Sequence, residues 1–176
     1  MDTGRRWILN LMDQAFDRPA WHGPNLLSTL RALSPEVAAW RPAPGRHSPW
    51  EIALHCAYWK HRVRQRVAPG AQRRFPREGR DWPRLPDELV ATAWRADLAL
   101  LKTAHAELRA AVLQLSAADL QRPGPRQKRS RMENLIGIAC HDLYHAGQVR
   151  LITRMLEGAR TRRRSGRRPR AGRIRA

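Results

Sequence analysis

Residues 130–156, SRMENLIGIACHDLYHAGQVRLITRML, contain the clearest structural signal in this chain. Ser130 followed three residues later by Glu133 forms a capping box, which marks the start of a helix. Apolar residues then recur at intervals of three and four, and we expect the helix to end near Leu156 or Gly158. Its inner line is Asn134, Ile138, His141, His145, Gln148, Ile152 and Met155. The stretch therefore predicts a long helix with one buried face.

The same periodicity recurs in the rest of the chain. Residues 48–51, SPWE, combine a serine cap, a proline in the first turn and a glutamate that returns the capping hydrogen bond. Proline-rich connections separate the helical segments, most of all at 41–45 and 68–86. We predict an all-α protein, a four-helix bundle with long connections, whose helical segments are 7–16 with 24–33, 48–67, 87–115 and 130–156.

A chain of 176 residues is long enough for one domain with a core of its own. We place this domain at residues 1–157. Residues 159–176 contain nine arginines and no acidic residue, so they hold nearly half of the net charge of +19. A segment this polar cannot bury enough surface to offset the entropy cost of ordering. We therefore expect residues 158–176 to form an Arg-rich, disordered tail.

No apolar run approaches the roughly 20 residues that a membrane span requires. The first apolar residues are interrupted by Asn10 and Asp13, which argues against a signal peptide. The two cysteines, Cys56 and Cys140, lie inside predicted helices and suggest no disulfide framework. We expect a cytoplasmic protein that has no contact with a membrane.

Two histidines four residues apart, His141 and His145, project from one face of the last predicted helix. That face also carries the apolar residues, so the pair points into the protein. His55 lies within the apolar stripe of the helix predicted over 48–67. Three imidazoles from two helices can bind a divalent transition ion and leave positions open for water or substrate. These residues are the candidate metal ligands, although core histidines with satisfied hydrogen bonds are the alternative for each.

The other histidines are assigned different roles. His105 also lies on an apolar face, but nothing else on its helix is suited to join it as a ligand, so it is a candidate core residue or a support for the site. His22, His47 and His61 lie near helix ends or on other faces. Candidates to line the pocket or orient a ligand are Trp59, Tyr144, Gln148 and His47, with core packing as the alternative for the tryptophan.

The histidine pair also differs from the zinc-protease motif His-Glu-x-x-His, because Asp142 replaces the glutamate. The shorter carboxylate would reach a metal-bound water poorly, and no further ligand motif follows. Peptidase activity is therefore not expected. Asp142 is more simply explained as a carboxylate on the helix face, paired with an arginine.

The chain resembles the DinB-like (DinB/YfiT) superfamily of bacterial four-helix-bundle proteins. The resemblance covers roughly Leu9 to Leu156. It rests on the segments 21–24 (WHGP), 44–51 (PGRHSPWE), 54–59 (LHCAYW) and 137–148 (GIACHDLYHAGQ). The order and spacing of His55, His141 and His145 match the metal triad that the family implies.

The resemblance also implies a reaction. Relatives include thiol-S-transferases and a mycothiol-dependent isomerase, which implies a metal that activates a small thiol. A similar protein would use a low-molecular-weight thiol as co-substrate, attack a small-molecule electrophile with the thiolate, and hold a carboxylated thiol with arginines such as Arg46 or Arg62. Relatives often form homodimers.

Three functions remain open from the sequence. The leading one is a metal-dependent S-transferase or a related, hydrolase-like enzyme. The second is a non-catalytic metal-binding protein of stress response or sensing, and the third is nucleic-acid binding through the Arg-rich tail. Imidazole ligands suit zinc, nickel, iron and copper alike, so the sequence does not select the metal.

Overall fold

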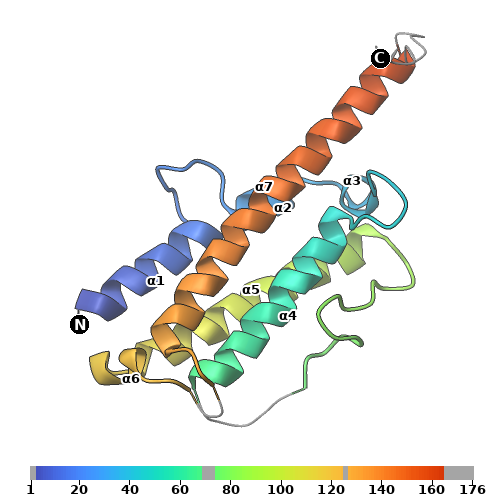
Figure 1. Cartoon of the computed structure of the whole chain (residues 1–176). Coiled ribbons are helices and arrows are strands. Elements are labelled where there is room, and N and C mark those ends of the chain that lie inside the picture. The colour runs from blue at the N-terminus through green and yellow to red at the C-terminus, as the bar shows by residue number, and fades with distance from the viewer. Residues whose placement is uncertain (1–2, 69–73, 125–126, 165–176) are drawn as a thin grey trace, which may run out of the picture.

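The computed structural model describes residues 3–68, 74–124 and 127–164, and these residues contain seven helices (Figure 1). Their only β feature is an isolated bridge between Pro123 and Ser130. The all-α class is therefore confirmed. The helices are α1 (Thr3–Phe16), α2 (Leu26–Arg31), α3 (Pro35–Ala39), α4 (Pro49–Val67), α5 (Ala91–Leu113), α6 (Ala117–Gln121) and α7 (Arg131–Arg164).

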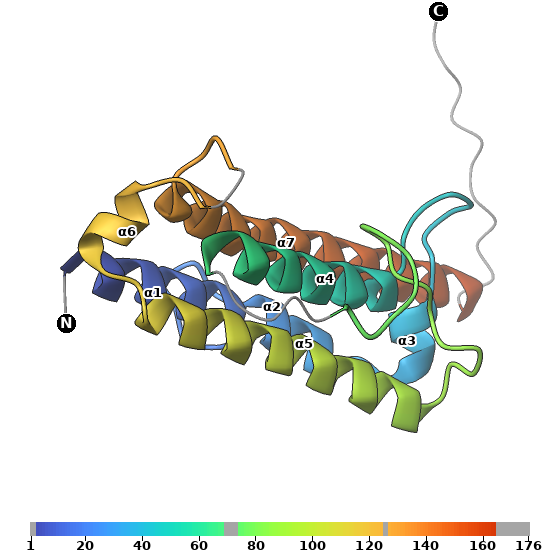
Figure 2. The same ribbon diagram turned by 90° about the horizontal axis from the view of Figure 1, so that it is seen from below.

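The four long helices α1, α4, α5 and α7 lie alongside one another (Figures 1 and 2). α4 packs against both α5 and α7, and α1 packs against α7 and α5. The short helices α2 and α6 contact α7, whereas α3 contacts α4. This arrangement places α4 beside α7, so the two helices that carry the candidate ligands are neighbours.

Both predicted capping boxes are present. The Ser48 side chain accepts a hydrogen bond from the backbone N–H of Glu51, and the Glu51 carboxylate accepts one from the backbone N–H of Ser48. Ser130 and Glu133 make the same two bonds at the start of α7. Each pair satisfies backbone donors that a helix N-terminus otherwise leaves free.

Several helix boundaries differ from the prediction. α5 begins at Ala91 rather than near Asp87, and its N-cap residue Val90 makes no side-chain capping bond. The short helix α6, which was not predicted, begins at another capping box, between Ser116 and Asp119. Five residues are too few to show a periodicity.

The end of α7 also differs. The helix continues through Gly158 to Arg164, beyond the predicted end. Alanine and arginine are good helix formers, and residues 159–164 consist of them apart from Thr161. Residues 158–164 of the expected tail are thus helical, while residues 165–176 lie outside the described part of the chain. None of the described helices is long and apolar enough to cross a membrane.

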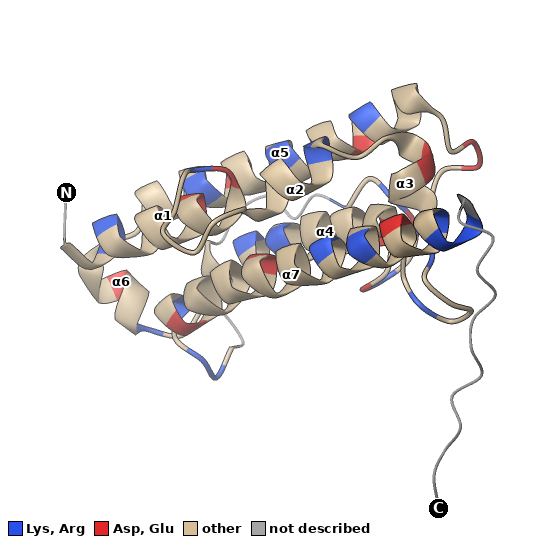
Figure 3. Ribbon diagram, turned by 90° about the horizontal axis from the view of Figure 1, so that it is seen from above, with Lys and Arg blue, Asp and Glu red and all other residues tan. Residues whose placement is uncertain are grey.

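The hydrophobic core consists of two clusters of buried residues. One surrounds Trp50 and Leu54 of α4, and the other surrounds Leu108 of α5 and Leu135 of α7. Basic residues are distributed over several helices and gather in the C-terminal half of α7 (Figure 3).

A buried ion pair joins α4 and α7. Lys60 of α4 and Asp142 of α7 are each 1% exposed, and the Lys60 ammonium donates to Oδ2 of Asp142. The ammonium also lies 4.8 Å from the ring centroid of Phe16. Burial raises the pKa of Asp142 to about 6, against the opposing effect of Lys60, so the carboxylate is ionised at neutral pH. The pair joins the two helices that carry the candidate ligands.

Candidate metal centre

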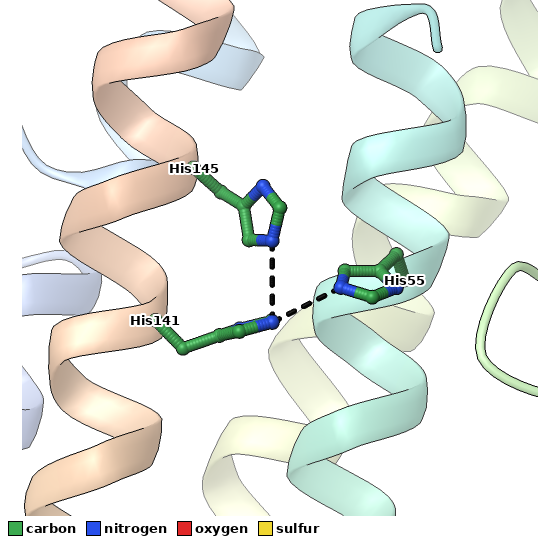
Figure 4. A group of neighbouring side chains, drawn as sticks. All are labelled: His55, His141 and His145. Carbon is green, nitrogen blue, oxygen red and sulfur yellow. Dashed lines mark hydrogen bonds between the residues drawn. The ribbon is translucent and has the colours of Figure 1, made fainter.

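The three histidines predicted as ligands lie together between α4 and α7 (Figure 4). His55 comes from α4, and His141 and His145 come from successive turns of α7. Nε2 of His141 lies 3.0 Å from Nε2 of His55 and 3.2 Å from Nε2 of His145. The helical phase of α4 and α7 therefore brings three imidazole nitrogens to one point.

The Nδ1 atoms of His55 and His145 are hydrogen-bonded to oxygen atoms. Nδ1 of His55 lies 2.7 Å from the backbone carbonyl oxygen of Asp81, which can only accept a hydrogen bond. Nδ1 of His145 lies 2.7 Å from Oε1 of Gln148, whose own Nε2 donates to the Tyr144 hydroxyl at 2.9 Å. Both rings must carry their proton on Nδ1, which leaves the Nε2 lone pairs directed at the centre.

Burial lowers the pKa of all three histidines. The pKa of His141 falls to about 3, because burial is reinforced by His145 and His55. That of His145 falls to about 4 through burial and His55. The pKa of His55 is lowered by burial, although its hydrogen bond to Asp81 opposes the shift. All three imidazoles are thus neutral at pH 7, the form that binds a metal.

This donor set fits a divalent cation. A neutral imidazole has one N–H. A proton on Nε2 of His141 therefore cannot donate well-aligned hydrogen bonds to Nε2 of both His55 and His145. A cation can accept all three lone pairs. Tetrahedral ligands at Zn–N distances of 2.0–2.1 Å would be separated by about 3.3–3.4 Å, close to the observed nitrogen separations.

A second group of potential ligands, Cys56 with His141 and Asp142, is less suited to a metal. The Lys60 ammonium already neutralises the charge of the Asp142 carboxylate through Oδ2. Burial raises the pKa of the Cys56 thiol well above its usual value, which disfavours the thiolate that a metal needs. The same geometry corrects the expected pairing of Asp142 with an arginine, since its partner is a lysine in the core.

The segment between α4 and α5 covers the histidines. The Trp82 ring stacks on His55 at a centroid distance of 4.0 Å and on His47 at 3.5 Å. Asp81 has φ of 63°, a left-handed conformation that glycine, asparagine and aspartate tolerate better than other residues. Its carboxylate accepts a hydrogen bond from Nε1 of Trp59 at 2.6 Å.

This covering segment is anchored to α5. Arg77 donates from Nε to Oδ1 of the buried Asp97 at 3.1 Å, and Oδ2 of Asp97 accepts from Nε1 of Trp50 at 2.8 Å. Sequence reasoning missed both Asp81 and Trp82 as parts of the site. They lie in a proline-rich connection that has no periodicity, and no local signal shows which histidine they contact.

The conformation of Asp81 leads to a prediction about metal affinity. Asn tolerates the left-handed region, so Asp81→Asn should keep the carbonyl on His55 and change metal affinity by no more than about threefold. Asp81→Val should displace that carbonyl, since a β-branched residue resists positive φ, and weaken affinity by about 10–100-fold. Competition titration with a chromogenic chelator measures both values. Equal affinities for the two variants would show that Asp81 does not position His55.

An open cavity of about 780 Å³ borders the three histidines. Its wall includes three of the four predicted pocket residues, His47, Tyr144 and Gln148, and also Arg46. Trp59 lines a different cavity of about 170 Å³ on another side of His141. Arg62, the other arginine considered for a carboxylated ligand, lines neither of these cavities.

His105 is a core residue that does not belong to the group of three candidate ligands. Its ring stacks on Phe16 at 3.9 Å, and burial together with Lys60 and Arg109 lowers its pKa to about 2. Nε2 lies 3.5 Å from the Asp13 carboxylate, but Arg109 at 3.0 Å already pairs with that carboxylate. We therefore regard His105 as neutral rather than as part of an ion pair.

This assignment predicts how stability depends on pH. Below pH 6.5 His105 becomes protonated in the unfolded chain but not in the folded chain. The free energy of unfolding therefore decreases by about 1.4 kcal/mol for each unit by which the pH is lowered. His105→Phe can keep the stacking and removes this titration. Urea unfolding should show wild type losing about 2 kcal/mol relative to the variant between pH 6.5 and 5. Parallel pH profiles for the two proteins would contradict a neutral, buried His105.

The remaining histidines also lie outside the group of three. His22 is exposed, and Nε2 of His61 lies 3.0 Å from Nε2 of Gln65 on the same helix.

Comparison with known proteins agrees with this architecture. The family model of the DinB superfamily matches residues 20–149, which include α2 to α6 and the three histidines. No curated protein and no solved structure gives a significant match. Because the family model covers well over half of the sequence, the chain belongs to the DinB superfamily.

Proposed function

We propose that this protein binds a divalent transition metal ion through His55, His141 and His145 and uses it to transfer a small thiol to an electrophile. The observation that carries the metal site is the convergence of three Nε2 atoms, two of which must present lone pairs. A bound divalent ion in this position supplies positive charge that favours the thiolate form of a neighbouring thiol.

The cavity offers groups that can bind such a substrate. Ile152, Leu151 and Met155 supply an apolar wall, and Arg46 is an exposed cation at the same cavity. The Tyr144 hydroxyl accepts a hydrogen bond from Gln148, which leaves its own proton available for a ligand. The cavity thus combines a surface for an apolar electrophile with groups that recognise a carboxylate.

Metal content tests the first half of the proposal. Purified wild type loaded with zinc or nickel should retain about one ion per chain, and His55→Ala should lose it. His22→Ala is the matched control, because it removes an exposed histidine and should leave the content unchanged. Unchanged metal content in His55→Ala would disprove the three-histidine site.

A panel of thiols with a common electrophile tests the second half. Metal-dependent turnover with glutathione, cysteine, bacillithiol or mycothiol supports the enzyme. Arg46→Ala should raise KM for glutathione, which carries carboxylates, and leave KM for cysteamine unchanged, since cysteamine has none. If the metal-loaded protein turns over no thiol, the non-catalytic metal-binding function is favoured.

A further inference from the structure

A second large cavity is lined by none of the three histidines. Its volume is about 730 Å³, close to that of the cavity beside the histidines, and the two cavities share no lining residue. One wall is a face of α4, and the other is the segment 74–80, which runs beside α4 in Figure 1. A concave site of this volume is large enough to enclose a small molecule.

The wall on α4 is a polar face that is held by its own contacts. Tyr58, His61, Arg62 and Gln65 line the cavity at intervals of three, four and seven residues, the spacing of one helix face. Oε1 of Gln65 accepts a hydrogen bond from Nη1 of Arg62 at 3.1 Å. Nε2 of Gln65 lies 3.0 Å from Nε2 of His61. These contacts restrict the side chains that a ligand would meet.

The opposite wall is attached to two helices. The Phe75 ring meets the Tyr58 ring of α4 edge-on, at a centroid distance of 5.5 Å. Two residues later, Arg77 pairs with the buried Asp97 of α5. The segment is thus fixed to α4 at one point and to α5 at another. A cavity that is already formed lowers the entropy cost of binding a ligand.

Three exposed arginines at this cavity have no carboxylate partner within the described part of the chain. They are Arg62 of α4 and Arg74 and Arg80 of the segment. Glu78 is the acidic residue among the described lining residues, and Asp97 already neutralises Arg77. Guanidinium groups bind phosphate and carboxylate groups through paired hydrogen bonds. The cavity therefore favours a ligand with more than one negative charge.

Two partly exposed aromatic rings lie among these cations. Tyr58 and Phe75 both line the cavity, so it offers aromatic surface together with positive charge. Aromatic side chains prefer to contact another ring, and a guanidinium group also stacks on planar groups. This combination fits a ligand that has a flat ring as well as anionic groups.

From these observations we propose that the cavity binds a small molecule in which a planar ring carries two or more anionic groups. Phosphate and carboxylate groups share this chemistry, so a nucleoside diphosphate and an aromatic polycarboxylate are its two sources. The site goes beyond the proposed function and uses none of the proposed metal ligands. Binding can be measured on the metal-free protein, so a failure here and a failure of the metal site are distinguishable.

Isothermal titration calorimetry of the full, metal-free chain with ADP and with trimesate, a benzene tricarboxylate, tests the site. At about 0.15 M salt, which screens exposed charges beyond roughly 8 Å, at least one of them should bind with a micromolar Kd. Adenosine has the ring without the charge and should bind at least about tenfold more weakly than ADP. Binding of ADP alone selects phosphate, and binding of trimesate alone selects carboxylate. Binding of neither anion would overturn the proposal.

Charge-matched variants separate this cavity from general attraction to a basic protein. Arg62→Gln and Arg80→Gln should each weaken binding of the anion about tenfold, because each removes a charge-assisted hydrogen bond. Arg84→Gln is the control, since it removes the same charge from the same connection at an exposed position outside the cavity. All three variants should keep the melting temperature of wild type. An equal loss of affinity in all three would show attraction by the net charge of +19 instead of a site.

The variant Phe75→Leu tests the preference for a ring, because it keeps an apolar side chain and removes the aromatic one. It should weaken ADP about threefold or more and leave pyrophosphate, which has no ring, unchanged. For a carboxylate ligand, the same comparison uses trimesate and citrate. A variant that binds ligands with and without a ring equally less well would refute the ring contact, since Phe75 would then only support the wall.

Discussion

Adding zinc or nickel to the metal-free protein is expected to raise its melting temperature substantially, and His141→Ala should abolish the increase. An ion at one hundred times its Kd stabilises the folded state by about 2.7 kcal/mol, which corresponds to about 5–10 °C for a domain of this size. His141 is the common neighbour of the other two ligands, at 3.0 and 3.2 Å. Its loss should weaken binding by more than the roughly 10–100-fold typical of residues that only orient a ligand.

Differential scanning fluorimetry with and without metal measures this effect. His105→Phe serves as a control, because His105 is buried but lies outside the group of three, and it should keep the full metal-dependent increase. An equal increase in wild type and His141→Ala would mean that the ion binds elsewhere, for instance to exposed side chains.

Replacing Lys60 with methionine is expected to destabilise the protein by about 3–5 kcal/mol, because it leaves the Asp142 carboxylate buried and unpaired. The defect should shrink as the pH falls. In folded wild type the pKa of Asp142 is raised to about 6 although Lys60 lowers it, so removing Lys60 raises this pKa further and the folded variant takes up a proton at a higher pH than folded wild type does. Acidification therefore favours the folded variant relative to wild type. Urea unfolding at pH 7 and pH 5 measures both effects.

The double variant Lys60→Met with Asp142→Val separates charge from packing. Apolar replacement of both members of a buried pair is often neutral or stabilising. We expect most of the lost stability to return, by the same unfolding measurement. If the double variant were as unstable as Lys60→Met alone, lost contacts of the Lys60 side chain, whose ammonium lies over the Phe16 ring, would explain the loss instead of the unpaired charge.

Helical periodicity predicted much of the fold and the three candidate ligands. His55, His141 and His145 lie in long helices, and within a helix the spacing of residues determines the face on which each side chain projects. The capping boxes at Ser48 and Ser130 were equally readable, because each is a hydrogen-bond pattern between residues three apart. These features are local, so the order of residues is sufficient to predict them.

Other features of the site required the tertiary structure. Asp81 and Trp82 lie in a connection without periodicity, and only the packing of this connection against α4 brings them to His55. Lys60 and Asp142 are 82 positions apart, and their pairing depends on how α4 lies against α7. The sequence by itself thus determined which faces of the helices are buried and which histidines they carry. The tertiary structure decided what meets those faces, because contacts between distant segments arise from packing and leave no spacing pattern in the chain.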